Sequence, residues 1–209
     1  MQSALDQTIA ILTQQQTQIA VMRAAAKQPL INDTFTALLN TSLDTQTPTV
    51  SQGSKWIEQV GDWAIANNQV SSNGTAGSLA WIEAKTGDSC IIESDVIFAD
   101  SLVPQGIVFR YVSPTSYWRA CYSKGTAKWM INEIAAGVTS TRASTGGAVT
   151  FGQVYKLRIV LEGGNIGFYV NDEPLLNWTS TINMSSGKHG LYASSAATKF
   201  DNFKVVSLA

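Results

Sequence analysis

Apolar and polar positions alternate in short segments from about residue 32 to the end of the chain. This alternation is typical of β-strands that bury one face. Turn sequences such as Asn73-Gly74, Ser113-Pro114 and Gly163-Gly164-Asn165 separate the segments. The predicted strands cover residues 63–65, 78–83, 90–98, 106–112, 117–123, 128–133, 154–161, 166–170, 190–193 and 199–206. No helical pattern intervenes, so the sequence predicts an all-β antiparallel sandwich or jelly roll.

The first 28 residues follow a different pattern, because they contain no Gly or Pro and are rich in Gln. Leu5, Ile9, Leu12 and Ile19 fall on the apolar positions of a heptad repeat, which predicts a helix with one apolar stripe. A helix of this length is marginal alone, so its stripe needs a partner. Three arrangements are open: the helix packs on its own domain, copies of it form a short coiled coil, or it docks on a larger assembly. We expect the second, and divide the chain into residues 1–28 and a β-domain of residues 29–209.

Composition excludes several classes of protein. The chain of 209 residues has 44% hydrophobic and 14% charged residues and a net charge of −1. Nucleic-acid binding needs a basic surface, and disorder needs few apolar residues, so neither is expected. No apolar run is long enough to span a membrane. The first 22 residues hold no Lys or Arg and so lack the pattern of a secretory signal. Either the mature form of a secreted protein starts here or the protein is made in a cytoplasm without a signal, and we expect the second.

Aromatic residues crowd the predicted central strands. Rings that stack on sugar faces beside an Arg are typical of lectin-like sites, and exposed aromatics mark binding surfaces. The candidate glycan-binding residues are Arg110, Tyr117, Trp118 and Trp129. The alternative is that most of these rings fill the core, as aromatic residues in sandwiches usually do.

Strand alternation assigns these residues to faces. It places Trp118 on one face and Tyr117 with Arg119 on the other. It also places Arg110 on the face opposite to Phe109 and Tyr111.

A series of short motifs, in order along residues 32–207, resembles concanavalin A-like (laminin-G-like) jelly-roll domains of the kind found in bacteriophage tail and fibre proteins. The opening motifs are Asp33-Thr34-Phe35 and Gly61-Asp62-Trp63-Ala64-Ile65-Ala66-Asn67-Asn68, and the central ones are Gly106-Ile107-Val108-Phe109-Arg110-Tyr111 and Tyr117-Trp118. The closing motifs are Tyr155-Lys156-Leu157-Arg158-Ile159, Ile166-Gly167-Phe168-Tyr169-Val170-Asn171, Gly187-Lys188-His189-Gly190-Leu191-Tyr192 and Phe200-Asp201-Asn202-Phe203-Lys204-Val205. The resemblance implies a two-sheet jelly-roll sandwich after the N-terminal helix.

The resemblance also implies a function. We expect a bacteriophage virion protein on the tail or capsid exterior, made in the host cytoplasm. It would be a homotrimeric tail-fibre or receptor-binding component whose jelly roll binds host-surface polysaccharide. Its other partners would be virion proteins. Two alternatives are a virion decoration or baseplate protein that binds no glycan, and a bacterial carbohydrate-binding module.

The closing strand contains Phe200 and Phe203, which are three residues apart. A β-bulge at Asp201-Asn202 would bring both rings to the core. Such a bulge presents a carboxylate and carbonyl oxygens together, which are ligands that Ca²⁺ prefers. The resemblance adds Asp33 to Asp201 as a candidate for a structural calcium site. The alternative is two ordinary hydrogen-bonded carboxylates, and we expect no required cofactor.

We expect no enzyme activity. Glu93 and Asp95 share a strand face, as the carboxylates of glycosidases do, but Ile97 stands where hydrolases of the resembling fold carry a third acid. His189 is the single histidine and has no nucleophile motif to serve. Cys90 and Cys121 are expected to be unpaired, because a predicted meander of residues 90–98, 106–112 and 117–123 keeps them apart.

Overall fold

The computed structural model describes residues 29–37, 40–84, 86, 88–184 and 187–208, together with Gln15. Within these residues the chain forms two antiparallel sheets. The strands of sheet A are β1 (Ile31–Asp33), β2 (Thr41–Ser42), β4 (Trp63–Ala66), β5 (Gln69–Ser72), β7 (Cys90–Ile97), β12 (Val154–Glu162), β13 (Asn165–Val170), β14 (Glu173–Thr179) and β16 (Lys199–Ser207). The strands of sheet B are β3 (Ile57–Val60), β6 (Ser78–Glu83), β8 (Gln105–Ser113), β9 (Ser116–Ser123), β10 (Lys128–Ala135), β11 (Val138–Gly146) and β15 (Lys188–Ala193). A short 3-10 helix, η1 (Leu43–Thr45), follows β2.

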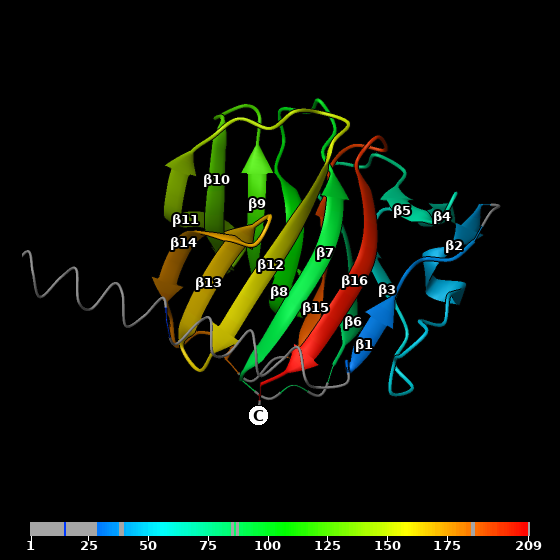
Figure 1. Ribbon diagram of the computed structural model, residues 1–209, viewed down its shortest axis with the longest axis horizontal. Helices are drawn as coiled ribbons and strands as arrows, with labels where there is room; N and C mark the ends of the chain where they lie inside the picture. The colour runs from blue at the N-terminus through cyan, green and yellow to red at the C-terminus, as the bar shows by residue number, and fades with distance from the viewer. Residues whose placement is uncertain are drawn as a thin grey trace, which may run out of the picture.

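The two sheets stack face to face as a jelly-roll sandwich. Sheet A has the strand order β14-β13-β12-β7-β16-β5-β4-β2, with β1 paired to β16, and sheet B has the order β11-β10-β9-β8-β15-β6-β3. In Figure 1 sheet A faces the viewer, and the edge strands β11 and β14 lie beside each other at the left. This architecture confirms the predicted all-β fold class.

A single apolar core lies between the sheets. The inner strands send alternate side chains into it, and Trp118 and Ala120 of β9 share this core with Ile92 of β7 and Phe168 of β13 from the other sheet. Other buried apolar side chains form two smaller clusters, one on the outer face of each sheet. These inner strands therefore have one face fixed by the core and an outer face available for other contacts.

Most predicted strands are confirmed, including the β12–β13 hairpin, in which Leu161 pairs with Ile166. The predicted meander is wrong: β7 pairs with β12 and β16 in sheet A, whereas β8 lies in sheet B. Cys90 and Cys121 are both free and buried. They belong to different sheets, and Cys90 faces the core.

Two bulges shape the central strands. The register between β16 and β7 shifts between Asp201 and Lys204, and Asn202 takes a positive φ of 51°. Phe200 and Phe203 consequently both lie in the core, which confirms the predicted bulge. A second bulge, in β8, centres on Arg110, which has a φ of 50°.

The predicted N-terminal helix and its stripe residues Leu5, Ile9, Leu12 and Ile19 lie outside the described residues. Among the residues that the structure does describe, no helix has the length and apolar character needed to cross a membrane.

Candidate functional site

A row of paired residues crosses the outer face of sheet B. Gly190 of β15 lies between Trp81 of β6 and Val108 of β8. Arg119 of β9 then lies between Val108 and Asn132 of β10. We call these five residues the cross-strand row. It has an aromatic end at Trp81 and a polar end at Arg119 and Asn132.

The polar end contains two unmet hydrogen-bonding atoms. The guanidinium carbon of Arg119 lies 4.6 Å from the centroid of the Tyr192 ring, and Asn132 Nδ2 donates to Cys121 Sγ at 3.6 Å. Arg119 Nε and Asn132 Oδ1 are buried and have no hydrogen-bond partner among the described groups. A buried polar atom left without a partner costs roughly 1–3 kcal/mol. One donor and one acceptor on paired residues match a hydroxyl group, which can accept and donate at once.

The aromatic end supplies flat apolar surface with polar tips. The rings of Trp81 and Tyr111 stack with centroids 5.5 Å apart, and the Tyr111 hydroxyl donates to Gln59 Oε1 at 2.9 Å. Lys188 Nζ lies 4.5 Å from the centroid of the Trp81 ring. Burial raises the pKa of Tyr111 and of Tyr117, so both phenols stay protonated at neutral pH and can donate hydrogen bonds.

Arg110 lies inside the domain, where the expected alternation does not hold. The bulge turns its fully buried side chain inward and brings Tyr111 to the same outer cluster as Val108. Its Nη2 donates to the carbonyl oxygens of Asp88, at 3.3 Å, and Gly163. Arg110 thus holds two loops from within rather than facing a ligand.

Trp118 and Trp129 also lie away from the cross-strand row. Both rings belong to the core between the sheets, where Trp118 stacks on Phe109 at 6.3 Å and Trp129 meets Phe98 edge-on at 5.4 Å. Of the four candidates named from the sequence, Tyr117 is the one on the outer face of sheet B. Tyr117 shares this face with Arg119, as alternation predicts, since both lie beside Tyr192.

Asp33 and Asp201, the calcium candidates, lie where β1 meets the bulge of β16. Asp33 is buried, and its carboxylate accepts from Trp56 Nε1 and the Phe35 N–H, each at 2.8 Å. Burial, and then the nearby charges of Asp95 and Asp33, raise the pKa of Asp201. In the part of the chain that the structure describes, no group of three or more His, Cys, Asp or Glu residues is placed to hold a metal ion. The calcium site remains a prediction.

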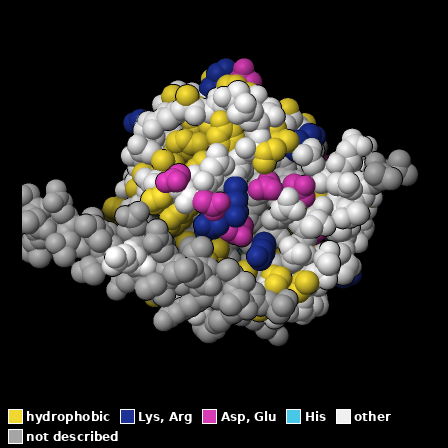
Figure 2. Space-filling view, viewed as in Figure 1, with side chains coloured by type: hydrophobic (Ala, Val, Ile, Leu, Met, Phe, Trp, Pro, Cys, Tyr) yellow, Lys and Arg dark blue, Asp and Glu magenta, His cyan; other side chains and the backbone are white. Residues whose placement is uncertain are grey.

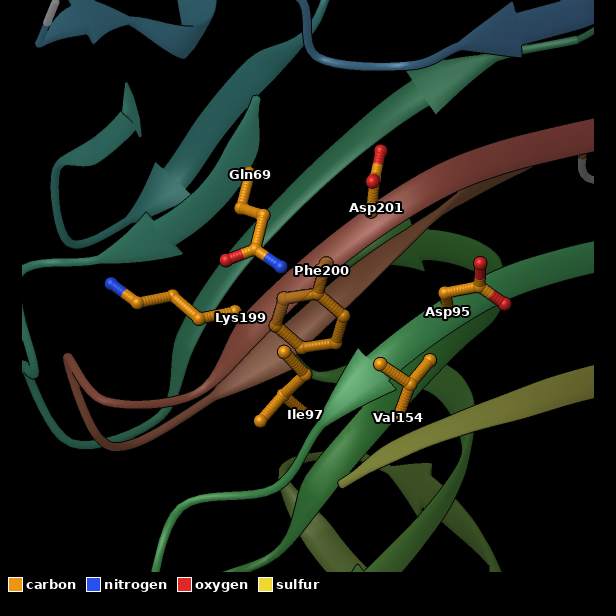
Figure 3. A pocket seen from close by; sticks show the side chains of 7 residues that line it. All are labelled: Gln69, Asp95, Ile97, Val154, Lys199, Phe200 and Asp201. Carbon is orange, nitrogen blue, oxygen red and sulfur yellow. The ribbon is translucent and has the colours of Figure 1, made fainter. Parts of the chain in front are cut away.

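A small hollow lies beside these carboxylates on the outer face of sheet A (Figure 3). Its volume is about 60 Å³, far below the roughly 300 Å³ of a ligand pocket. The amine of Lys199 and the carboxylates of Asp95 and Asp201 point in different directions, so their charges do not converge on one ligand. The hollow has room for water or an ion and not for a sugar ring.

Glu93, the other carboxylate considered for catalysis, is neutralised by ion pairs. Its Oε1 lies 2.6 Å from Arg158 Nε and 3.4 Å from Lys156 Nζ. Figure 2 shows basic and acidic side chains gathered together at the centre of this face. The Glu93 carboxylate is therefore engaged with two cations of the neighbouring strand β12.

Sequence reasoning missed Trp81, Asn132 and Tyr192. Alternation within β9 places Tyr117 with Arg119, but the other members of the site come from β6, β10 and β15. The register between strands that are distant in sequence brings them together, and alternation within one strand cannot reveal that register.

Comparison with solved structures identifies proteins of similar fold. No model of a known protein family and no curated protein matches the sequence. The carbohydrate binding module CBM66 from Bacillus subtilis superposes with a TM-score of 0.64 and 20% identity, over 73% of this chain and 95% of the module. The GH43 BlXynB protein from Bacillus licheniformis gives 0.65 and 16% identity, over 87% of this chain and 40% of that protein. The galectin LEC-6 from Caenorhabditis elegans gives 0.50 and 12%, over 60% of this chain and 88% of the galectin.

These three structures share the galectin-like and carbohydrate-binding-module jelly roll with this chain. At such identities the likeness establishes the fold, so any ligand must be argued from the residues themselves. The three structures provide no link to bacteriophage tail or fibre proteins.

Proposed function

We propose that this domain binds carbohydrate at the outer face of sheet B, with Arg119 and Asn132 holding one sugar hydroxyl between them. The observation that carries the proposal is the pair of buried, unpartnered atoms, Arg119 Nε and Asn132 Oδ1, on directly paired residues. Trp81 and Tyr111 at the aromatic end would contact the apolar face of the ring. The names of the fold neighbours, a carbohydrate binding module and a galectin, are in accord with this proposal.

The test is a screen of the full-length protein against a glycan array, followed by calorimetry on the best glycan. Losing one hydrogen bond to a buried partner costs roughly 1–3 kcal/mol, so Asn132→Leu should raise the Kd roughly 5- to 150-fold. Arg119→Met should do the same, and it retains a side chain that can cover Tyr192. Trp178→Ala, on β14 of sheet A, is the matched control and should leave the Kd unchanged.

Two outcomes would count against the proposal. Tight binding that survives both Arg119→Met and Asn132→Leu would move the site off this face. Failure to bind any glycan would favour the alternative of a domain that binds only other proteins. Circular dichroism of each variant separates lost binding from lost folding.

The sequence motifs extend the proposal to a bacteriophage receptor-binding component that acts by binding without cleaving. Several copies on one particle would raise the avidity of weak contacts by roughly 10²–10⁴. The observation favouring this proposal is the order of the sequence motifs alone. Light scattering tests its assembly, because a homotrimer has three times the chain mass of 22.4 kDa.

A further inference from the structure

An apolar patch lies on the outer face of sheet A, on the side away from the core. It consists of Ile91 of β7, Val160 of β12, Tyr169 of β13 and Val206 of β16. Ile91 pairs directly with Val160 on one side and with Val206 on the other. Tyr169 extends the patch across Gly167, where an added Cβ would lie 3.0 Å from the tyrosine ring.

The patch is buried although it faces outward. Ile91, Val160, Tyr169 and Val206 are only 3%, 3%, 9% and 2% exposed. Val154, at the far end of β12, is 58% exposed on the same sheet. Side chains in a row on a sheet shield each other's flanks and leave their outer ends open, so exposures this low indicate that the outer ends of these four side chains are covered.

We propose that residues 1–28 cover this patch, with the apolar stripe of Leu5, Ile9, Leu12 and Ile19 lying against it. The chain enters the sandwich next to the patch, because the Leu30 N–H donates to the Val205 carbonyl at 2.8 Å and Ile31 pairs with Val205. Of the described hydrophobic residues outside the strands, Leu208 packs against the patch. Every other gap in the described chain is one or two residues long, too short to cover four side chains.

The dimensions agree with this occupant. A helix of 28 residues is about 42 Å long, and four neighbouring strands span roughly 15–20 Å. The stripe is therefore long enough to cross the patch and bury it as a third layer. This intramolecular arrangement takes the place of the coiled coil that the stripe alone led us to expect, and it is independent of the glycan proposal.

Photo-crosslinking of the full chain tests the contact. Benzoylphenylalanine in place of Leu12 should crosslink within one chain, to peptides that contain Ile91, Val160, Tyr169 or Val206. The same group in place of Gln14, on the opposite side of the predicted helix, is the matched control and should crosslink these peptides several-fold less. Crosslinks between chains, or to any other part of the domain, would overturn the proposal.

A second measurement does not depend on the crosslinker. Leu12→Asp in the full chain should uncover the patch and raise the binding of an apolar dye several-fold, whereas Gln14→Asp should not. Both variants should keep the solution mass of the parent. A dye signal that Leu12→Asp leaves unchanged, or a lower mass for Leu12→Asp alone, would contradict the intramolecular contact.

Discussion

The backbone N–H of Arg110 donates to Nδ1 of His189 at 3.4 Å inside the sandwich. Nε2 of the same ring lies 3.7 Å from Cys90 Sγ. The bulge in β8 creates this arrangement, because it carries Arg110 inward next to β15 and the start of β7. Both ring nitrogens of His189 are thus engaged in a place that solvent does not reach.

The His189 ring should make the protein less stable in acid. Burial, and then the charge of Arg110, lower the pKa of His189 from 6.5 to about 3. Between about pH 6.5 and 3 the unfolded chain therefore binds a proton that the folded chain excludes, and the free energy of unfolding falls by about 1.4 kcal/mol per pH unit. Urea unfolding at pH 6.5 and pH 4.5 should show a larger loss for the parent than for His189→Gln, which can still accept from Arg110. Equal losses would mean that His189 titrates in the folded state.

Both thiols should be inert in the folded protein. Burial raises the pKa of Cys90 to about 12 and that of Cys121 to about 11, so almost no thiolate exists at pH 7. Ellman's reagent should label neither cysteine in the native state and both in denaturant. Labelling of Cys121 alone under native conditions would show that the outer face of sheet B opens to solvent.

Trp118 should matter for stability rather than for contact with a ligand. Its ring is fully buried between the sheets, so Trp118→Ala should lower the free energy of unfolding by roughly 3–5 kcal/mol. Trp178, which is 37% exposed on the edge strand β14, provides the comparison, and Trp178→Ala should cost less than about 1 kcal/mol. Chemical denaturation measures both. A Trp118→Ala protein of normal stability would contradict the core assignment.

The protein should be more stable when the side chain at position 201 is neutral. The raised pKa of Asp201 means that its charged form is disfavoured in the folded state. The charged carboxylate therefore lowers the free energy of unfolding at pH 7, and this loss is absent at low pH. Asp201→Asn should raise the melting temperature slightly at pH 7, and the gain should vanish near pH 3. Its amide oxygen can still accept the Asn202 N–H that Asp201 Oδ1 now accepts at 2.7 Å.

The same variant tests the calcium prediction. Millimolar calcium should raise the melting temperature of the parent at pH 7 if Asp201 helps to hold the cation, and Asp201→Asn should remove that rise. Identical melting curves with calcium and with a chelator would leave two hydrogen-bonded carboxylates at this place.

The sequence predicts the fold well because most strands bury one face and expose the other, which leaves a clear alternation of apolar and polar residues. It even locates one bulge, since the spacing of Phe200 and Phe203 cannot otherwise place both rings in the core. The bulge at Arg110 leaves no such sign, because Phe109, Arg110 and Tyr111 alternate as an ordinary strand would. Consequently Arg110 was expected on a binding surface and lies within the domain.

Six strands also escaped prediction, namely β1, β2, β3, β5, β11 and β14. The edge strands β11 and β14 did so for different reasons. β11 is mostly exposed on both faces, so polar residues fill it and no alternation appears. β14 contains Pro174, and a proline within a segment argues against a strand when elements are predicted from the sequence. The candidate site was predicted in part, because its Tyr117 and Arg119 share one strand, whereas Asn132 and Trp81 reach it through pairing.

The polar edge strand β11 has a consequence for how copies of this protein behave when crowded together. An open strand nine residues long offers a template on which a second molecule could extend the sheet. Arg142 is the extra residue where the register with β10 shifts, and its Nε lies 2.7 Å from Glu133 Oε2. The irregular backbone and the charge of Arg142 interrupt the template near its middle. Both features disfavour pairing of β11 with a strand of a neighbouring molecule, and so oppose fibril formation at high protein concentration.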